Sequence, residues 1–372
     1  MFRLYGLVIA LHMYPAWRLL PDLPFGRAGV AVLSIWLIVS ACLLPLGLFA
    51  RRIVRQPFAD RLAWAGLIAM GSFSSLFVLT FLRDVTLLFA LALDWYRFQA
   101  WSAAGVPMLA ALVTLMGLYN ARRRAAVRAI DISIAGLPPA LHGFTIAQIS
   151  DIHIGPTIKR PYVEAIVAAV NALEADMIAV TGDLVDGSVR GLFSHTAPLS
   201  RLAARHGTYF VTGNHEYYSG ANDWIAEIGR LGMRVLMNEH VVLEHEGESV
   251  VVAGVTDFNA HHYDESHRSD PNAAMLGAPA HAALRLLLAH QPRSAFAAEP
   301  VGFDLQLSGH THGGQFWPWN YFVRLQQPFT AGLGRRGALW VYTSRGTGYW
   351  GPPKRLWAPS EITHLRMVAA PA

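Results

Sequence analysis

Cysteine, charge and, in the first third, acidic side chains are scarce in this 372-residue sequence. The single cysteine, Cys42, excludes a disulfide within the chain, which fits the cytoplasm but does not exclude an oxidising compartment. Charged residues make up 15% and hydrophobic residues 53% of the chain, against about a quarter and a half in ordinary soluble domains. This balance excludes disorder, a collagen-like chain and a tail that coats nucleic acid.

The charges are distributed unevenly about Arg124. Residues 1–124 contain 12 arginines and four aspartates but neither lysine nor glutamate, which gives a net charge of +8. The other 248 residues carry 18 basic and 21 acidic groups, so the pI near 9.5 belongs to the first third alone. No nucleic-acid partner is therefore expected for the C-terminal part. The linker 121–128 is the expected boundary between a membrane domain, 1–124, and a second domain, 125–372.

Three uncharged runs predict membrane-spanning helices. A helix needs about 20 apolar residues to cross a hydrocarbon core about 30 Å thick. Three buried soluble helices are the alternative, but soluble helices seldom remain uncharged for so long. A shorter segment, 4–17, either spans or lies in the interface, and it lacks the cleavage site of a signal peptide. The three runs have 23, 21 and 24 residues and lie at 28–50, 62–82 and 98–121.

Arginine clusters indicate the orientation of these helices. By the positive-inside rule, the clusters at 51–61 and 122–128 are expected in the cytoplasm, whereas the loop 94–97 has one arginine. The sequence thus predicts a multi-pass protein of a bacterial-type inner membrane with a cytoplasmic C-terminal domain. After Arg83 and Asp84 the apolar character resumes over 85–93, which is too short for another span. It either extends the preceding helix or places a charge pair within it.

Short apolar runs that end in Gly, Asp, Asn or His predict an alternating α/β domain after Arg128. The amphipathic run 161–173 is typical of a crossover helix in a layered α/β fold. Helices are expected at 159–174, 194–205, 221–231 and 272–280. Strands are expected at 129–134, 144–150, 176–181, 207–212, 249–255, 284–289, 303–308, 338–343 and 361–367.

Metal-capable side chains follow five of these strands, at the ends where layered α/β proteins gather their sites. Each fragment alone is weak, since a single Asp-x-His or Gly-Asp occurs often by chance, but five in order are a specific signal. Six other histidines lack this context and are expected at the surface: 195, 206, 240, 245, 267 and 281. His261 and His262 either rim the site or belong to a loop. The candidate metal ligands are Asp151, His153, Asp183, Asn214, His290, His310 and His312.

Oxygen and imidazole ligands without thiolates suit Mn²⁺, Fe²⁺, Zn²⁺ or Mg²⁺. Seven groups exceed one tetrahedral site, so two ions about 3.5 to 4 Å apart that share a carboxylate are expected. Such a pair can hold a bridging hydroxide in line with phosphorus, which predicts phosphate ester hydrolysis. His215 is the candidate acid for the leaving oxygen, and Asp186 the carboxylate that orients it and raises its pKa. Gly182, Gly213 and Gly309 let the backbone approach the ions.

With its motifs Asp-x-His, Gly-Asp, Gly-Asn-His, His and Gly-His-x-His in order, the chain from 129 to 368 resembles the calcineurin-like metallophosphoesterase superfamily. The run from Gly309 to Gln315, with Ser344-Arg345-Gly346, is similar to the bacterial branch of YkuE and YaeI type proteins. The resemblance implies a two-layer β-sandwich flanked by helices. It implies one ion on Asp151, His153 and His312, a second on Asn214, His290 and His310, a bridging Asp183, and His215 with Asp186 as the acid pair.

Residues 316–322 are unusually aromatic for a loop beside a metal site. They either pack onto the sandwich or, with Tyr349, Trp350 and Trp357, form an apolar lip that touches the bilayer or a lipid substrate. The candidate substrate-binding residues are Arg345, Lys354 and Arg355, which suit phosphate or lipid headgroups unless they form an ordinary solvated face.

The leading expectation is a membrane-anchored phosphoesterase for a lipid-linked or membrane-proximal phosphate. Similar membrane-bound family members cleave the pyrophosphate of UDP-diacylglucosamine, which makes that lipid a candidate by analogy. One alternative keeps the chemistry, with the spans as a tether and a soluble phosphomonoester, phosphodiester or phosphoprotein as substrate. Another is a membrane sensor or scaffold with a structural metal site, although an intact His215 and Asp186 argue against it.

Overall fold

The computed structural model describes residues 2–92 and 98–370. It divides into two compact units, Met1–Arg122 with Gly351–Leu356, and Arg123–Trp350 with Trp357–Ala372. No local sequence pattern indicates that Gly351–Leu356 belongs with the N-terminal helices. The loop 94–97, which entered the orientation argument, lies outside the described residues.

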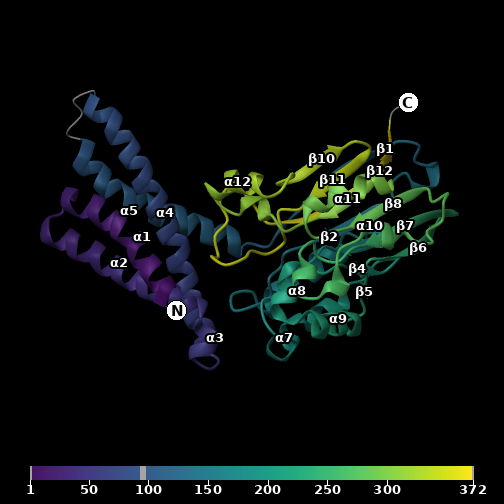
Figure 1. Cartoon of the computed structure of the whole chain (residues 1–372), viewed down its shortest axis with the longest axis horizontal. Coiled ribbons are helices and arrows are strands. Elements are labelled where there is room, and N and C mark those ends of the chain that lie inside the picture. The colour runs from purple at the N-terminus through teal and green to yellow at the C-terminus, as the bar shows by residue number, and fades with distance from the viewer. Residues whose placement is uncertain (1, 93–97, 371–372) are drawn as a thin grey trace. The chain divides into compact units, whose positions relative to one another are not determined.

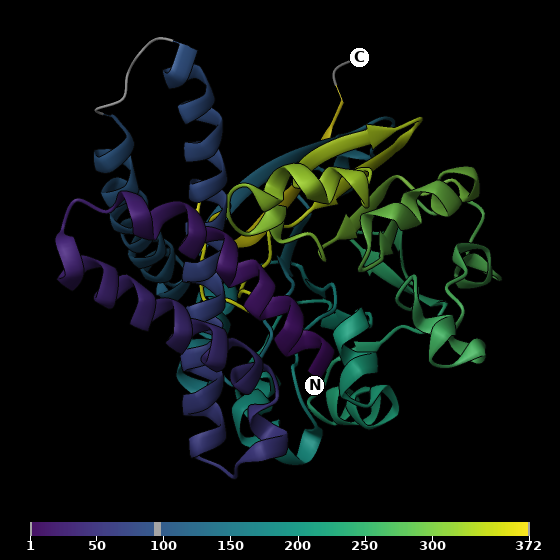
Figure 2. The ribbon, with the colours of Figure 1, turned by 60° about the vertical axis from the view of Figure 1, so that its left-hand side comes forward.

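Long helices make up most of the first unit (Figures 1 and 2). Three of those in the described ranges, α2, α4 and α5, are long and apolar enough to cross a membrane, as the uncharged runs predict. The helix α1 forms over the segment that includes 4–17. The elements are α1 (Phe2–Leu19), η1 (Leu20–Asp22), α2 (Gly26–Leu48), α3 (Ala50–Ile53), α4 (Phe58–Ala92) and α5 (Phe98–Arg122).

The helix α4 continues past Arg83 and Asp84, so the apolar residues after them extend the same helix. Its 35 residues span about 50 Å, which exceeds a hydrocarbon core about 30 Å thick. The Arg83 guanidinium is buried and donates to Asp22 and, at 2.9 Å, to the Arg18 carbonyl. Asp84 in turn accepts from Arg18 at 2.9 Å and from Tyr14 at 2.7 Å. These polar partners satisfy charges that would otherwise be costly among membrane helices.

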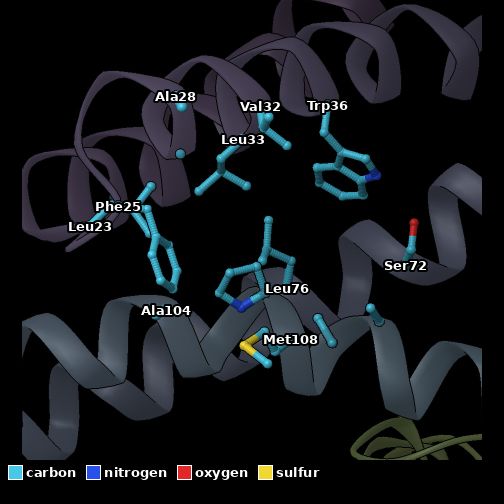
Figure 3. Close-up of a pocket in the computed structure, with 14 residues that line it drawn as sticks. Leu23, Phe25, Ala28, Val32, Leu33, Trp36, Ser72, Leu76, Ala104 and Met108 are labelled. Atoms are coloured by element: carbon cyan, nitrogen blue, oxygen red, sulfur yellow. The ribbon is translucent and has the colours of Figure 1, made fainter.

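An apolar cavity of about 470 Å³ lies among α2, α4 and α5 (Figure 3). Leu33, Trp36 and Leu76 are drawn around its interior, and Ser72 contributes a hydroxyl to its wall. Residues of the first unit supply the lining of this cavity.

The second unit is a sandwich of two six-stranded mixed sheets. In the first, β2 to β5 run parallel, and in the second so do β7, β8, β9 and β11. The first sheet has the order β1 (Ala126–Ile134), β12 (Glu361–Ala369), β2 (Thr145–Ile149), β3 (Met177–Val180), β4 (Thr208–Phe210), β5 (Arg234–Val235). The second has the order β10 (Gly332–Arg336), β11 (Leu339–Thr343), β9 (Leu305–Ser308), β8 (Leu284–Leu288), β7 (Glu248–Gly254), β6 (Glu239–His245).

Inward-facing side chains of both sheets form one buried core. Ile146 and Met177 from the first sheet and Leu286 and Leu307 from the second belong to it and are fully buried. Burying one such side chain contributes about 1.5 to 3 kcal/mol. The sandwich therefore holds the two sets of strand ends in fixed positions.

All nine expected strands are confirmed, and three others were missed. β5 has two residues, and β10 is an edge strand with two arginines, so neither presents an apolar run. β6 is also an edge strand, and charged residues and histidines flank its three apolar residues. The expected helices at 159–174 and 221–231 correspond to α6 (Arg160–Asn171) and α9 (Ala221–Arg230).

The helix expected at 194–205 is wrong in its bounds. The chain forms α7 (Val189–Thr196) and then the 3₁₀ turn η3 (Ala197–Arg201), because Pro198 cannot continue an α-helix. The helix expected at 272–280 is the shorter α10 (Pro271–Met275), which ends before Gly277 and Pro279. His245 was expected at the surface, but it is buried and packs edge-on against Phe144.

Candidate active site

The metal-capable side chains lie just beyond the carboxyl ends of parallel strands. Asp151 follows β2 and Asp183 follows β3, while His290 and His310 follow β8 and β9 of the other sheet. Asn214 begins the short helix α8 (Asn214–Ser219), which the chain enters after β4. Parallel strands present these ends at one edge of each sheet, so the topology itself brings the side chains together.

Five of the seven candidate ligands have a left-handed backbone. This conformation costs a non-glycine residue on the order of 1 to 3 kcal/mol, and it persists where the surrounding structure enforces it, commonly at functional sites. The φ angles are 53° at Asp151, 56° at His153, 54° at Asp183, 70° at His310 and 52° at His312.

Glycines permit the close approach of the loops. A Cβ atom at Gly213 would collide with the Asp183 carboxylate, and one at Gly309 would collide with Ser150 and Asp151. A Cβ atom at Gly182 would likewise collide with the His290 ring. The close approach of these glycines to the ions themselves stays a prediction.

One group of ligand atoms comes from Asp151, His153 and His312, which lie within 4.8 Å of one another. The Nε2 atoms of His153 and His312 are 3.0 Å apart, and the His312 Nε2 is 3.4 Å from an Asp151 oxygen. Two imidazole nitrogens and a carboxylate that converge in this way are a suitable donor set for a divalent cation.

A second group comes from Asp183, His290 and His310, again within 4.8 Å. The His290 Nε2 lies 3.2 Å from Oδ2 of Asp183 and 3.3 Å from the His310 Nδ1. The same Asp183 oxygen lies 3.8 Å from the His153 Nε2 of the first group. Asp183 thus stands between the two groups, where a shared carboxylate ligand would be needed.

The Asn214 side chain supplies an independent test of whether metal ions fit. Its Oδ1 atom is buried and lacks a hydrogen-bond partner among the described residues. Leaving such an acceptor unsatisfied costs about 1 to 3 kcal/mol. An amide oxygen is a ligand for hard divalent ions, so a cation there would satisfy it. The seven side chains therefore fit a pair of divalent ions, and the ligand role of each stays a prediction.

His215 and Asp186 lie beside these groups. The Nδ1 of His215 is 2.5 Å from Oδ1 of Asp186, and its backbone N–H donates to Asp183 at 2.8 Å. Burial disfavours the charged imidazole and so lowers the pKa of His215. The negative charges of Asp183 and Asp186 together outweigh this effect of burial and raise the pKa of His215 to about 9. The His215 side chain remains 13% exposed, whereas that of His290 is fully buried. A protonated, accessible imidazole at this position can donate to a leaving group.

His310 has the opposite electrostatics. Burial and the neighbouring His290 lower the pKa of His310 to about 3. A neutral imidazole is the form that binds a metal ion. The two histidines are therefore suited to different roles, one as an acid and the other as a ligand.

Glu216 is a site residue that the sequence reasoning missed. Its fully buried carboxylate accepts hydrogen bonds from the backbone N–H groups of Gly213 at 2.7 Å, Asp183 at 2.9 Å and Leu184 at 2.8 Å. Burial and the charge of Asp183 raise the pKa of Glu216 to about 8. The available signal was a Glu three residues after Gly213 at the start of a helix.

The three candidate substrate-binding cations have other partners. Arg345 donates to the buried carboxylate of Glu361 at 2.9 Å. Lys354 and Arg355 belong to the first unit and are buried. Their role in substrate binding stays a prediction.

The aromatic residues around 316–322 divide into two sets. Phe316 and Tyr349 are buried, as expected for a loop packed onto the sandwich. Trp317 is half-buried. The exposed residues fit the lip interpretation: Trp319, Tyr321 and Phe322 in α12 (Trp319–Phe322), with Trp350 and Trp357.

Comparison with known proteins adds to this geometry. Residues 144–314 match the calcineurin-like phosphoesterase family. The chain is 40% identical to a "Transmembrane protein with metallophosphoesterase domain" of Bos taurus, with 75% of this chain and 65% of that protein covered. It is 32% identical to an "Uncharacterized metallophosphoesterase" of Campylobacter jejuni, covering 70% and 68%. It is 28% identical to YkuE, an "Uncharacterized metallophosphoesterase" of Bacillus subtilis, covering 61% and 80%.

The chain thus spans less than two thirds of the bovine relative's length. The matches confirm the expected calcineurin-like phosphoesterase domain, and the two sheets of the second unit agree with the expected sandwich. Side-chain groups that could hold metal ions agree with a cofactor of two divalent ions. Phosphoester hydrolysis by the whole protein stays a proposal. The three apolar helices and the name of the bovine relative also support a membrane protein. The chain belongs to the calcineurin-like metallophosphoesterase family.

Proposed function

We propose that the protein hydrolyses a phosphate or pyrophosphate ester at the cytoplasmic face of the membrane that its helices cross. The observation that carries this proposal is the His215–Asp186 pair beside two metal-capable groups, with Asp183 in one group and 3.8 Å from the His153 Nε2 of the other. A purely structural metal site needs neither an acid nor a carboxylate to orient it. The pair therefore disfavours a sensor or scaffold.

Each side chain has a part in this reaction. Bound divalent ions supply charge that activates water and stabilises the phosphoryl oxygens. His215 donates its proton to the leaving oxygen, and Asp186 keeps the ring oriented and stabilises its charged form. Asp151, His153 and His312 would hold one ion and Asn214, His290 and His310 the other, and Asp183 would serve both.

The exposed aromatic side chains favour a lipid-linked or membrane-proximal substrate. Tyr321 is 60% and Trp357 75% exposed, and amphipathic rings are enriched at membrane–water interfaces. The ring of Trp350, 53% exposed, has its centroid 5.8 Å from that of His215. UDP-diacylglucosamine is a specific candidate by analogy with similar membrane-bound family members.

A substrate panel tests this proposal. Purified, metal-loaded full-length protein would be assayed with nucleotides, phosphodiesters and lipid pyrophosphates in vesicles, beside His215→Ala. Faster turnover of the lipid pyrophosphates by the wild type is expected. Preferential turnover of a soluble ester would instead favour the tether alternative, and hydrolysis of none would refute the proposal.

The orientation rests on the arginine-rich ends of the helices. Arg51 and Arg52 lie in α3, and Arg122 ends α5. A reporter fused after Arg124 is expected to be active as a cytoplasmic fusion in a bacterial inner membrane. Periplasmic activity of that reporter would overturn the orientation.

A further inference from the structure

Gly351–Leu356, although close to the C-terminus in sequence, belongs to the helical unit. At its centre Lys354 is 1% exposed. The Lys354 ammonium donates to the Gly71 carbonyl at 3.0 Å and to the Ser75 hydroxyl, both on α4. It also donates to the Thr114 hydroxyl on α5 at 3.4 Å. The segment is thus bonded to two of the three helices that can cross a membrane.

Backbone bonds strengthen this attachment to α5. The Arg355 N–H donates to the Gly117 carbonyl at 2.9 Å, and the Asn120 side chain donates to the Arg355 carbonyl at 3.2 Å. Gly117 lies five residues before Arg122, which ends α5. At about 1.5 Å per residue, Gly117 is about 8 Å inside that end of the helix. A lysine held at such a depth is costly unless satisfied, and such residues commonly have a function.

Both α4 and α5 have a glycine where they pack against Gly351–Leu356. A Cβ atom at Gly117 would collide with the Lys354 side chain, and one at Gly71 would come within 3.1 Å of Pro352. In contrast, a Cβ atom at Gly105, also on α5, meets nothing within 4 Å. The glycines at 71 and 117 therefore fit this segment specifically, whereas Gly105 offers a matched control on the same helix.

The residues on either side of the segment are held beside the metal-ligand loop of the catalytic unit. The Trp350 N–H donates to the Gln315 side chain at 2.9 Å, and the Gln315 amide returns a bond to the Trp350 carbonyl at 2.8 Å. Trp357 forms an antiparallel bridge with Phe316. Gln315 and Phe316 closely follow the candidate ligand His312, and the Trp350 ring contacts that of His215 at 5.8 Å.

We propose that Gly351–Leu356 is an anchor by which the membrane helices set the position of Trp350 against His215, with Lys354 as the positioning residue. The proposal rests on the hydrolytic function proposed above and extends it. The helices then do more than tether the enzyme, because the acid depends on them even with a water-soluble substrate.

The anchor itself can be tested without any activity. Lys159 and Lys354 are the two lysines of the sequence, so a water-soluble amine reagent has few targets. In full-length protein in lipid nanodiscs, mass spectrometry is expected to find Lys159 modified and Lys354 protected until the protein is denatured. Equal rates of modification at the two lysines would overturn the anchor, whatever the protein hydrolyses.

The positioning role is tested with Lys354→Met and Gly117→Leu, beside the control Gly105→Leu. Hydrolysis of an alkyl phosphodiester, whose leaving group needs an acid, is expected to fall about 10-fold or more in kcat for the first two variants, because small misplacements of catalytic groups are costly. A p-nitrophenyl phosphodiester, whose leaving group needs little protonation, should lose much less. Metal content and KM should match those of the control.

Equal losses with both esters, or no loss in either variant, would overturn the positioning role, because a general structural defect does not depend on the leaving group. If the wild type hydrolyses no phosphoester, the proposed function fails, and the lysine modification still decides whether the anchor exists.

Discussion

Oδ1 of Asp186 lies 2.5 Å from Nδ1 of His215 and 3.1 Å from Nδ1 of His153, so one carboxylate orients both the candidate acid and a candidate ligand. Burial raises the pKa of Asp186, but the contacts with these two imidazoles lower it more, so the pKa lies below its ordinary value. Asp186 therefore remains charged at neutral pH and can couple proton donation to the metal site. Substitutions at His215, Asp183 and Asp186 should separate these two effects.

His215→Ala is expected to abolish measurable hydrolysis of alkyl esters while bound metal stays nearly unchanged. The imidazole is placed as a proton donor, and general acids of this kind contribute on the order of 100-fold to 10,000-fold in rate. Turnover and metal content would be measured on the same preparation, with the exposed His281→Ala as control. Turnover that survives in His215→Ala would contradict the acid role.

Asp183→Ala is expected to release at least one ion and to lose activity with it. Its Oδ2 lies 3.2 Å from the His290 Nε2 and 3.8 Å from the His153 Nε2, so no neighbouring ligand can replace it in both groups. Metal analysis after gel filtration gives the ion count per protein. Retention of both ions would refute the shared ligand.

Asp186→Asn should show a mixed effect. The neutral amide no longer stabilises a charged His215, so kcat should fall about 100-fold. Loss of the contact to His153 should weaken metal affinity by about 10-fold, as for other partners that orient ligands. Rates measured against metal concentration separate the loss of proton donation from the loss of metal affinity. A saturating metal concentration restores only the activity that was lost through weaker metal binding. Full restoration by metal would contradict any role of Asp186 in proton donation.

Glu216→Ala is expected to destabilise the second unit. Three buried backbone N–H groups, those of Gly213, Asp183 and Leu184, would lose their acceptor, with a loss in the free energy of unfolding of about 3 kcal/mol. The measurement is denaturant unfolding of the variant beside Glu244→Ala, which removes an exposed carboxylate. Equal stability of the two variants would show that the carboxylate is not needed there.

The sequence predicted the central strands and the clustering of Asp151, Asp183 and His310 because both follow from local patterns, apolar runs that end in metal-capable residues. It missed β6 and β10, which are paired at the edges of the second sheet and present short or no apolar runs. From the sequence, Lys354 is expected to bind substrate or to lie on a solvated face. The short Pro-Pro-Lys-Arg run gives no indication that its partners are distant in the chain. The contact of Lys354 with Gly71 joins residues 283 apart in the chain, which no local pattern encodes.

Metal ions should stabilise the folded enzyme through the same side chains that bind them. A ligand that binds only the folded state adds about 2.7 kcal/mol at 100 times its dissociation constant, so the melting temperature should rise with the concentration of divalent ion. After chelation the protein should melt at a lower temperature, since Asp151 and Asp183 then remain buried without a cation. Differential scanning calorimetry of the chelated and metal-loaded forms measures the shift, with Asp183→Ala as the variant expected to show little of it. A shift of equal size in that variant would mean that the stabilising ions bind elsewhere, because the shared carboxylate is absent from it.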